Sequence, residues 1–335
     1  MQDRATGPHG PLAFQHGGTH LARMSAPSLP DIAVVYEHPL WFEPLFAALD
    51  RRGLTVAKVP LAGHTFDPAG SPPPAPVILS RVAMSSFLRS TEHPIFYAQS
   101  LFAHWEVRGA RVVNASALPV DTSKARQLAL ISALGLGIPE TRVVHRQADM
   151  AQAAQTLRFP VLVKADIGGS GAGIVRYERL EELAQAASEG IAPAGINGVS
   201  LIQEYAPRRG GKITRVEVMN GRILYAMEVE SPGDTFDQCP ADACLVRPGA
   251  PTLTMTRVEP EPVIAEAALA IAKAAQMEIG SVEYLIDDRD GQPRFFDVNA
   301  LSNFVADPMT VLGFDPHDDL VDWLTSIIET KRLAA

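Results

Sequence analysis

The sequence predicts two architectures in one chain, α/β and then α+β. Short apolar strand candidates alternate with helix-like stretches between residues 31 and 113, which is typical of a small doubly wound parallel sheet. After residue 121, four strand candidates interleave with two short helices. Beyond residue 212, two hairpin patterns flank an Ala-rich helix, which favours antiparallel pairing.

This pattern divides the chain into an extension and two domains. Residues 1–30 contain Gly, Pro and His without an apolar run, so we expect a disordered extension, with the native start at Met24. Residues 31–113 are expected to form the first domain and residues 114–335 the second. Within the second domain we expect a lid subdomain at about 138–205 and a C-terminal lobe at about 206–335.

The first domain contains four apolar segments that read as buried parallel strands. Helix-like stretches separate the strands, and a Pro- and Gly-rich loop precedes the third strand. The strands are expected at 31–36, 54–59, 77–81 and 111–114, the helices at 43–52 and 95–108, and the loop at 66–76.

The second domain is expected to begin with a helix capped by Asp121 or Thr122 and ending at Leu134. Asn220-Gly221 joins two strands through the strongest short hairpin signal. The strands are expected at 141–144, 160–165, 173–177, 201–205, 213–219, 223–229, 281–286 and 294–298. The helices are expected at 150–157, 180–187, 263–275 and 318–333.

Composition excludes several classes of function. A net charge of −9 and a pI near 5.5 argue against a nucleic-acid surface, which is normally basic. No apolar run approaches the length of about 20 residues that spans a bilayer, and the N-terminus lacks the apolar core of a signal peptide. We expect a cytoplasmic enzyme. Cys239 and Cys244 favour free thiols over a clipped loop or a redox pair.

The last hairpin carries acidic and amide side chains at positions that share one face. Asp297 and Asn299 lie two residues apart on one strand, and Glu283 lies on the other. Carboxylate and amide oxygens suit Mg²⁺, whereas acidic groups inside apolar strands are costly without a partner. A solvated polar face is the alternative for these three residues taken alone.

A glycine-rich turn follows the strand that contains Lys164. Its glycines allow backbone N–H groups to approach phosphate oxygens, and Lys164 adds a positive charge. A dinucleotide fingerprint would need a helix after the glycines, but β-favouring residues follow, and the Gly-Lys-Ser/Thr of a P-loop is absent. A hairpin without a ligand is the alternative. The turn contains Gly168, Gly169, Ser170, Gly171, Ala172 and Gly173.

Two further segments complete the candidate set. The strand ending in Gln203, Glu204, Tyr205 and Ala206 offers apolar contacts and polar groups to an adenine ring. Arg215 lies on the next strand, where an inward-facing guanidinium suits a transferring phosphoryl group. Lys124 stands near the start of a helix and alone would be a solvated lysine.

In this order and spacing, the segments resemble the ATP-grasp superfamily, and especially its carboxylate–amine ligases of the RimK and glutathione synthetase type. The resemblance covers about residues 114–333, and residues 31–113 resemble the domain that precedes the ATP-grasp fold. It implies ATP as cofactor and one or two Mg²⁺, with Mn²⁺ able to substitute. It also allows a homodimer.

The resemblance implies a role for each segment. Lys124 and Lys164 would bind phosphates under the 168–173 lid, while Glu204 and the backbone of Tyr205 and Ala206 would meet adenine. Arg215 would stabilise the transferring phosphate and the tetrahedral intermediate. The metal ligands would be Glu283, Asp297 and Asn299.

Three departures from the family pattern affect these expectations. The basic segment 207–212 stands where relatives often carry an acid for the ribose. Glu283 and Asp297 exchange the usual Asp and Glu, which should preserve ligation. Ser302-Asn303 replaces Pro-Gly, so we expect an altered substrate pocket.

The expected reaction joins an amino acid or peptide-like carboxylate and amine, with neither partner specified by the sequence. Arg81, Asn303 and His38, with Trp41 and Glu43 beside His38, are candidate substrate contacts. Two alternatives stay open: an ATP-grasp enzyme with a different acceptor or no ligation step, and a nucleotide-binding regulator without turnover.

Overall fold

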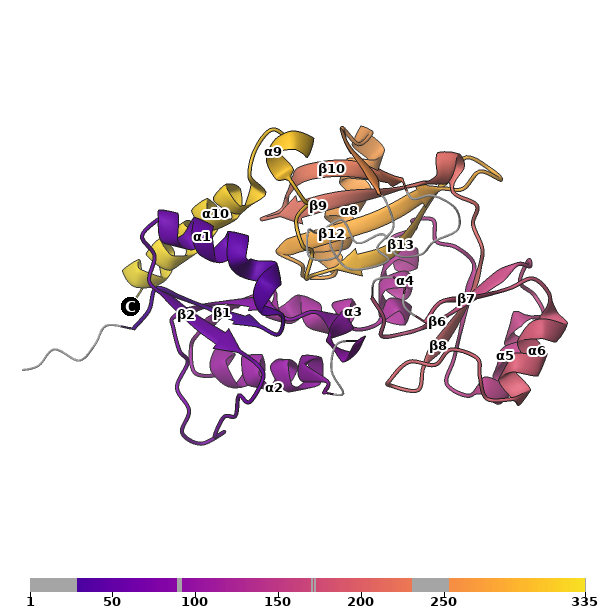
Figure 1. Ribbon diagram of the computed structural model, residues 1–335, viewed down its shortest axis with the longest axis horizontal. Helices are drawn as coiled ribbons and strands as arrows, with labels where there is room; N and C mark the ends of the chain where they lie inside the picture. The colour runs from indigo at the N-terminus through magenta and orange to yellow at the C-terminus, as the bar shows by residue number, and fades with distance from the viewer. Residues whose placement is uncertain (1–28, 89–91, 170, 172, 231–252, 335) are drawn as a thin grey trace, which may run out of the picture.

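The computed structural model describes residues 29–88, 92–169, 171, 173–230 and 253–334. Three sheets organise these residues, and Figure 1 shows them as three lobes. Residues 1–28 of the expected extension and the two cysteines lie outside the described residues.

The first sheet is four-stranded and parallel, as expected. Its order is β2-β1-β3-β4, so the chain crosses from one side of β1 to the other. The strands are β1 (Ile32–Tyr36), β2 (Val56–Pro60), β3 (Val77–Arg81) and β4 (Arg111–Val113). Helix α1 (Glu43–Arg51) packs on one face and α2 (Pro94–Glu106) on the other, because alternate strand residues supply two separate cores.

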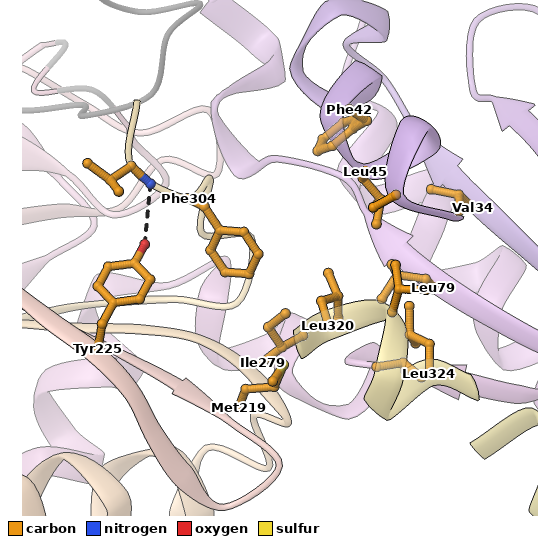
Figure 2. Packing of buried hydrophobic residues seen from close by; sticks show 14 of the residues in the cluster. Val34, Phe42, Leu45, Leu79, Met219, Tyr225, Ile279, Phe304, Leu320 and Leu324 are labelled. Carbon is orange, nitrogen blue, oxygen red and sulfur yellow. Dashed lines mark hydrogen bonds between the residues drawn. The ribbon is translucent and has the colours of Figure 1, made fainter. Parts of the chain in front are cut away.

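The last helix, α10 (Pro316–Leu333), returns to this first sheet and lies beside α1 (Figure 1). Leu320 and Leu324 are fully buried, and Figure 2 shows them between Leu79 of the first sheet and Met219 of the C-terminal lobe. Arg51 on α1 pairs with Asp318 at 2.9 Å. Residues at opposite ends of the chain therefore share one core.

The second sheet forms the lid subdomain, with antiparallel order β5-β8-β6-β7. Helices α5 (Met150–Ala154) and α6 (Leu180–Ser188) cover one of its faces through a core that includes Val163 and Leu183. The strands are β5 (Thr141–Val144), β6 (Val161–Ala165), β7 (Val175–Tyr177) and β8 (Ser200–Glu204).

The third sheet belongs to the C-terminal lobe and has the antiparallel order β11-β10-β9-β12-β13. Asn220 and Gly221 form the β9–β10 turn with φ of 50° and 71°, as the hairpin signal predicts. The elements are β9 (Lys212–Met219), β10 (Arg222–Glu230), β11 (Thr254–Val258), β12 (Ile279–Ile286), β13 (Pro293–Asn299), α4 (Lys124–Ala133) and α8 (Pro262–Ala274). Helices α4 and α8 contribute to the core on one face of the sheet.

One predicted helix start is wrong. Residues near Asp121 form a separate short helix, α3 (Leu118–Asp121), and Ser123 caps α4 by accepting a hydrogen bond from the Arg126 N–H. The Asp121 carboxylate instead accepts a hydrogen bond from the distant Ala300 N–H. The short elements β11 and α9 (Pro308–Val311) were not predicted. Among the described helices, none combines the length and apolarity needed to cross a bilayer.

Candidate active site

One cavity lies where the lid, the C-terminal lobe and the first domain meet. Most of the predicted site residues line it, although they are spread over more than 170 positions of the chain. Arg81, His38 and Gly173 are not among its lining residues, and Ser170 lies outside the described residues. The predicted residues that line it are Lys124, Lys164, Gly168, Gly169, Gly171, Gln203, Glu204, Tyr205, Ala206, Arg215, Glu283, Asp297, Asn299 and Asn303.

The cavity floor is a row of charged residues across three neighbouring strands. Glu283 on β12 stands opposite Arg215 on β9 and opposite Asp297 on β13. Arg215 Nη1 lies 3.4 Å from Glu283 Oε1, and Asn299 Nδ2 donates to the same oxygen at 3.3 Å. Lys124 from α4 forms an ion pair with Asp297. The alternation of the hairpin thus places the predicted metal ligands together.

Burial changes the acid–base properties of this floor. It raises the pKa of Glu283 to about 7, although Arg215 opposes the shift. Burial also raises the pKa of Asp121 to about 7. Asp121 lines the cavity, was not predicted as a site residue, and within the described chain its Oδ2 has no hydrogen-bond partner. A low-polarity setting strengthens every interaction with a charged ligand placed there.

The donor set fits a magnesium ion that shares its coordination with phosphate and water. Two carboxylates and one carboxamide face the cavity, and Mg²⁺ takes few protein ligands when substrate phosphates supply the others. The described residues contain no cluster of three or more His, Cys, Asp or Glu arranged to hold a metal. Asn299 would therefore be the third protein ligand.

Lys164 on β6 is buried at the lid side of the cavity. Its Nζ donates to Gln203 Oε1 on β8 at 2.8 Å. Burial lowers the pKa of Lys164 to about 7, and the positive charge of Lys124 adds to the shift. An anionic ligand bound beside this buried amine would raise the pKa of Lys164 again and so favour its protonated form.

The side chains of Glu204 and Tyr205 are held in place by neighbouring residues. The Glu204 carboxylate accepts a hydrogen bond from the Arg158 N–H at 2.8 Å and lies 3.3 Å from Arg289 Nη1. Its side chain is therefore already engaged, and the N–H groups of Glu204 and Tyr205 donate to the carbonyls of Glu140 at 2.9 Å and Pro160 at 3.0 Å. Arg176 lies over the Tyr205 ring at 4.4 Å from its centroid.

Ser302 connects the cavity floor to the first domain. Its hydroxyl accepts from Arg215 Nη2 at 2.5 Å and donates to Glu217, while Arg81 Nη2 donates to its carbonyl at 2.8 Å. Glu217 and Ser302 are fully buried and were not predicted as functional, because no local pattern marks them. His38 stacks on the cavity residue Trp41, with ring centroids 4.5 Å apart.

A family model described as the carbamoyl-phosphate synthase L chain, ATP binding domain, matches residues 123–310, more than half of the chain. The chain is an ATP-grasp protein. The chain also resembles solved structures at the level of fold. The ATP-grasp ligase PsnB with a precursor variant, Mg and ADP has a TM-score of 0.63 at 16% identity, covering 90% of this chain and 100% of that one.

Further similarities are to a solved RimK domain protein and to curated glutamate ligases. A RimK domain protein from Sphaerobacter thermophilus has a TM-score of 0.64 at 18% identity, covering 87% of this chain and 98% of that one. A probable alpha-L-glutamate ligase of Pseudoalteromonas translucida is 30% identical over 209 residues, 61% of this chain and 64% of the relative. One from Teredinibacter turnerae is 31% identical over 143 residues, 42% of this chain and 46% of the relative. The chain thus spans about half to two thirds of these relatives.

Gly169 lies directly against Ser85 of the first domain. A Cβ built on Gly169 would lie 2.5 Å from Ser85 Cβ, so this position has room only for glycine. Gly168 lies beside the Lys124 side chain, since its Cβ would come within 4.0 Å of Lys124 Cε. Gly168 and Gly169 thus line the cavity near the Lys124 side chain.

Proposed function

We propose that the chain is an ATP-dependent ligase that joins a carboxylate to an amine through an acylphosphate, releasing ADP and phosphate. The observation that carries the proposal is one cavity lined by three cations, Lys124, Lys164 and Arg215, which face the Glu283–Asp297 pair. The curated relatives named as probable alpha-L-glutamate ligases support the same chemistry.

The first step needs positioning of two anions. Lys124 and Lys164 bind the triphosphate, and Gly168 and Gly169 exclude water beside it. One or two Mg²⁺ ions held by Glu283, Asp297 and Asn299, with Mn²⁺ able to substitute, would supply charge neutralisation at the phosphates. A carboxylate oxygen of the substrate forms a bond to the γ-phosphorus while the bond to ADP breaks.

The second step forms the amide bond. The amine nitrogen attacks the acyl carbon, phosphate leaves with the bonding electron pair, and the amine proton passes to phosphate or water. Arg215 stabilises the oxyanion of the tetrahedral intermediate, and Ser302 and Glu217 hold its guanidinium in place. Asn303 lines the cavity one residue after Ser302 and is the proposed contact for a substrate polar group.

The substrates are proposed to be small amino acid or peptide-like molecules in the cytoplasm, without a nucleic acid or membrane partner. PsnB is described with a precursor peptide, and the relatives bear the name of glutamate ligases. Arg81 is buried and does not line the cavity, so it is proposed to contribute to substrate binding through its hydrogen bond to the Ser302 carbonyl. His38 is proposed to contribute by stacking on Trp41, which lines the cavity. We also propose that the protein forms a homodimer.

Incubation with ATP, Mg²⁺ and pools of amino acids or dipeptides tests the function, with ADP release as the signal. A ligase gives carboxylate-dependent ADP release and forms a hydroxamate when hydroxylamine replaces the amine. Hydroxamate without any amide product indicates another acceptor. Tight ATP binding without ADP release from any pool would favour the regulator and contradict the proposal. The Asp297→Ala variant is the control for contaminating ATPases.

A further inference from the structure

The main chain between the proposed metal ligands is held by a buried side chain from helix α4. Gln127 is fully buried and faces β13. Its Nε2 donates to the Val298 carbonyl at 2.9 Å, and its Oε1 accepts from the Val298 N–H at 3.1 Å. Both polar atoms of one amide are therefore bonded to the residue that separates Asp297 from Asn299.

Neighbouring residues continue this pattern along the same stretch. Asp121 Oδ1 accepts from the Ala300 N–H at 2.9 Å, and Asn114 Nδ2 donates to the Ala300 carbonyl at 2.8 Å. The hydrogen bond from Arg81 to the Ser302 carbonyl completes the series. Buried side chains from outside the hairpin thus fix the backbone on the far side of Asn299.

The direction of the strand explains why Val298 is the important position. Successive side chains on a strand point to opposite faces, so Asp297 and Asn299 point into the cavity while Val298 points away. A rotation of the Val298 peptide groups would turn both neighbouring side chains. Gln127 resists that rotation, because its amide bonds both the N–H and the C=O of Val298.

We propose that Gln127 is a positioning residue for the magnesium site, acting through Val298 on Asp297 and Asn299. This inference rests on the metal site of the proposed function. Gln127 also donates toward the carbonyls of Val120, at 3.2 Å, and Asp121, at 3.3 Å, so the same side chain connects α3 to Val298. Partners that orient metal ligands typically change metal affinity 10- to 100-fold when removed.

Calorimetric titration with ADP, in Mg²⁺ and separately in EDTA, tests this role without requiring turnover. In the Gln127→Met variant we expect the Kd for ADP with Mg²⁺ to rise about 10-fold. The Kd in EDTA should stay within about twofold, because the variant leaves the lysines unchanged. Gln147→Met in the lid is the matched control, since Gln147 also donates to a main-chain carbonyl, that of Ala192, at 2.8 Å. It should leave both values unchanged.

The outcomes separate the inference from the proposed function. No Mg²⁺ dependence in the wild-type protein would overturn the metal site itself. A wild-type dependence that Gln127→Met leaves intact, or an equal loss in Mg²⁺ and EDTA, would overturn the positioning role. If Gln127→Met does not fold, Gln127→Glu decides the question, because it keeps the oxygen that accepts from Val298. It should weaken only the Mg²⁺-dependent part, and an unchanged value would contradict the role.

Discussion

Replacement of Lys164 by methionine is expected to stabilise the ligand-free protein at neutral pH while it removes a phosphate contact. Lys164 is 6% exposed, and its ammonium donates to Gln203 Oε1. Burial lowers the pKa of Lys164 from an ordinary 10.5 to about 7, and Lys124 adds to the shift. An apolar side chain of similar length avoids this cost of burial.

The magnitude follows from the two pKa values. Each pKa unit corresponds to about 1.4 kcal/mol, so the shift costs about 4 kcal/mol of folding free energy at pH 7. Loss of the hydrogen bond to Gln203 offsets about 1–2 kcal/mol of the gain. We expect the Lys164→Met variant to be more stable than the wild type by about 2–3 kcal/mol at pH 7.

The sign of the pH dependence is distinctive. Between pH 7 and 10.5 the unfolded chain binds more protons at this lysine than the folded protein, so wild-type stability rises with pH in that window. At pH 9.5 the cost of burial falls to about 1 kcal/mol, and the advantage of the variant should nearly disappear.

Urea unfolding of both proteins at pH 7.0 and pH 9.5 measures the two differences. Lys273→Met on the exposed side of α8 is the control and should change stability by less than about 0.5 kcal/mol at both pH values. A Lys164→Met protein that is less stable at pH 7, or whose advantage is the same at both pH values, would refute the reasoning.

Three further predictions concern the lid and the metal site. Gly169→Ala should lower turnover because its Cβ would lie 2.5 Å from that of Ser85, and Ser85→Gly in the same chain should restore the rate; failure to restore it would contradict the contact. Since burial raises the pKa of Glu283 to about 7, Mg²⁺-dependent ADP binding should weaken up to about tenfold per pH unit below 7, and a flat profile from pH 6 to 8 would exclude this titration. Asp297→Ala should abolish ADP release with an unchanged circular dichroism spectrum, and wild-type rates would remove Asp297 from the site.

The predictions from sequence succeeded where the signal was local. The hairpin pattern predicted that Glu283, Asp297 and Asn299 share one face, and the observed register pairs Glu283 with Asp297. The alternation of strands and helices predicted the parallel sheet. The Asn-Gly pair predicted the turn at Asn220 and Gly221, where both φ angles are positive. These features depend on residues that are close in the sequence.

The contacts that the sequence could not reveal join distant residues. Asp121 meets Ala300, and Gln127 meets Val298, across more than 170 positions. Ser302 lies between Arg81 and Arg215 only because the first domain and the C-terminal lobe are packed together. A buried Asp, Gln or Ser has no local pattern that distinguishes it from an exposed one, so these supporting residues emerge only from the folded chain.

The position of α10 has a consequence for folding of the chain during its synthesis. Val34 and Leu79 lie on the face of the first sheet that is completed by Leu320 and Leu324 (Figure 2). During synthesis this face, which α1 covers only in part, leaves the ribosome more than two hundred residues before α10 is made. The nascent first domain therefore exposes part of an apolar surface until α10 is made, and a chaperone would bind to it during this interval.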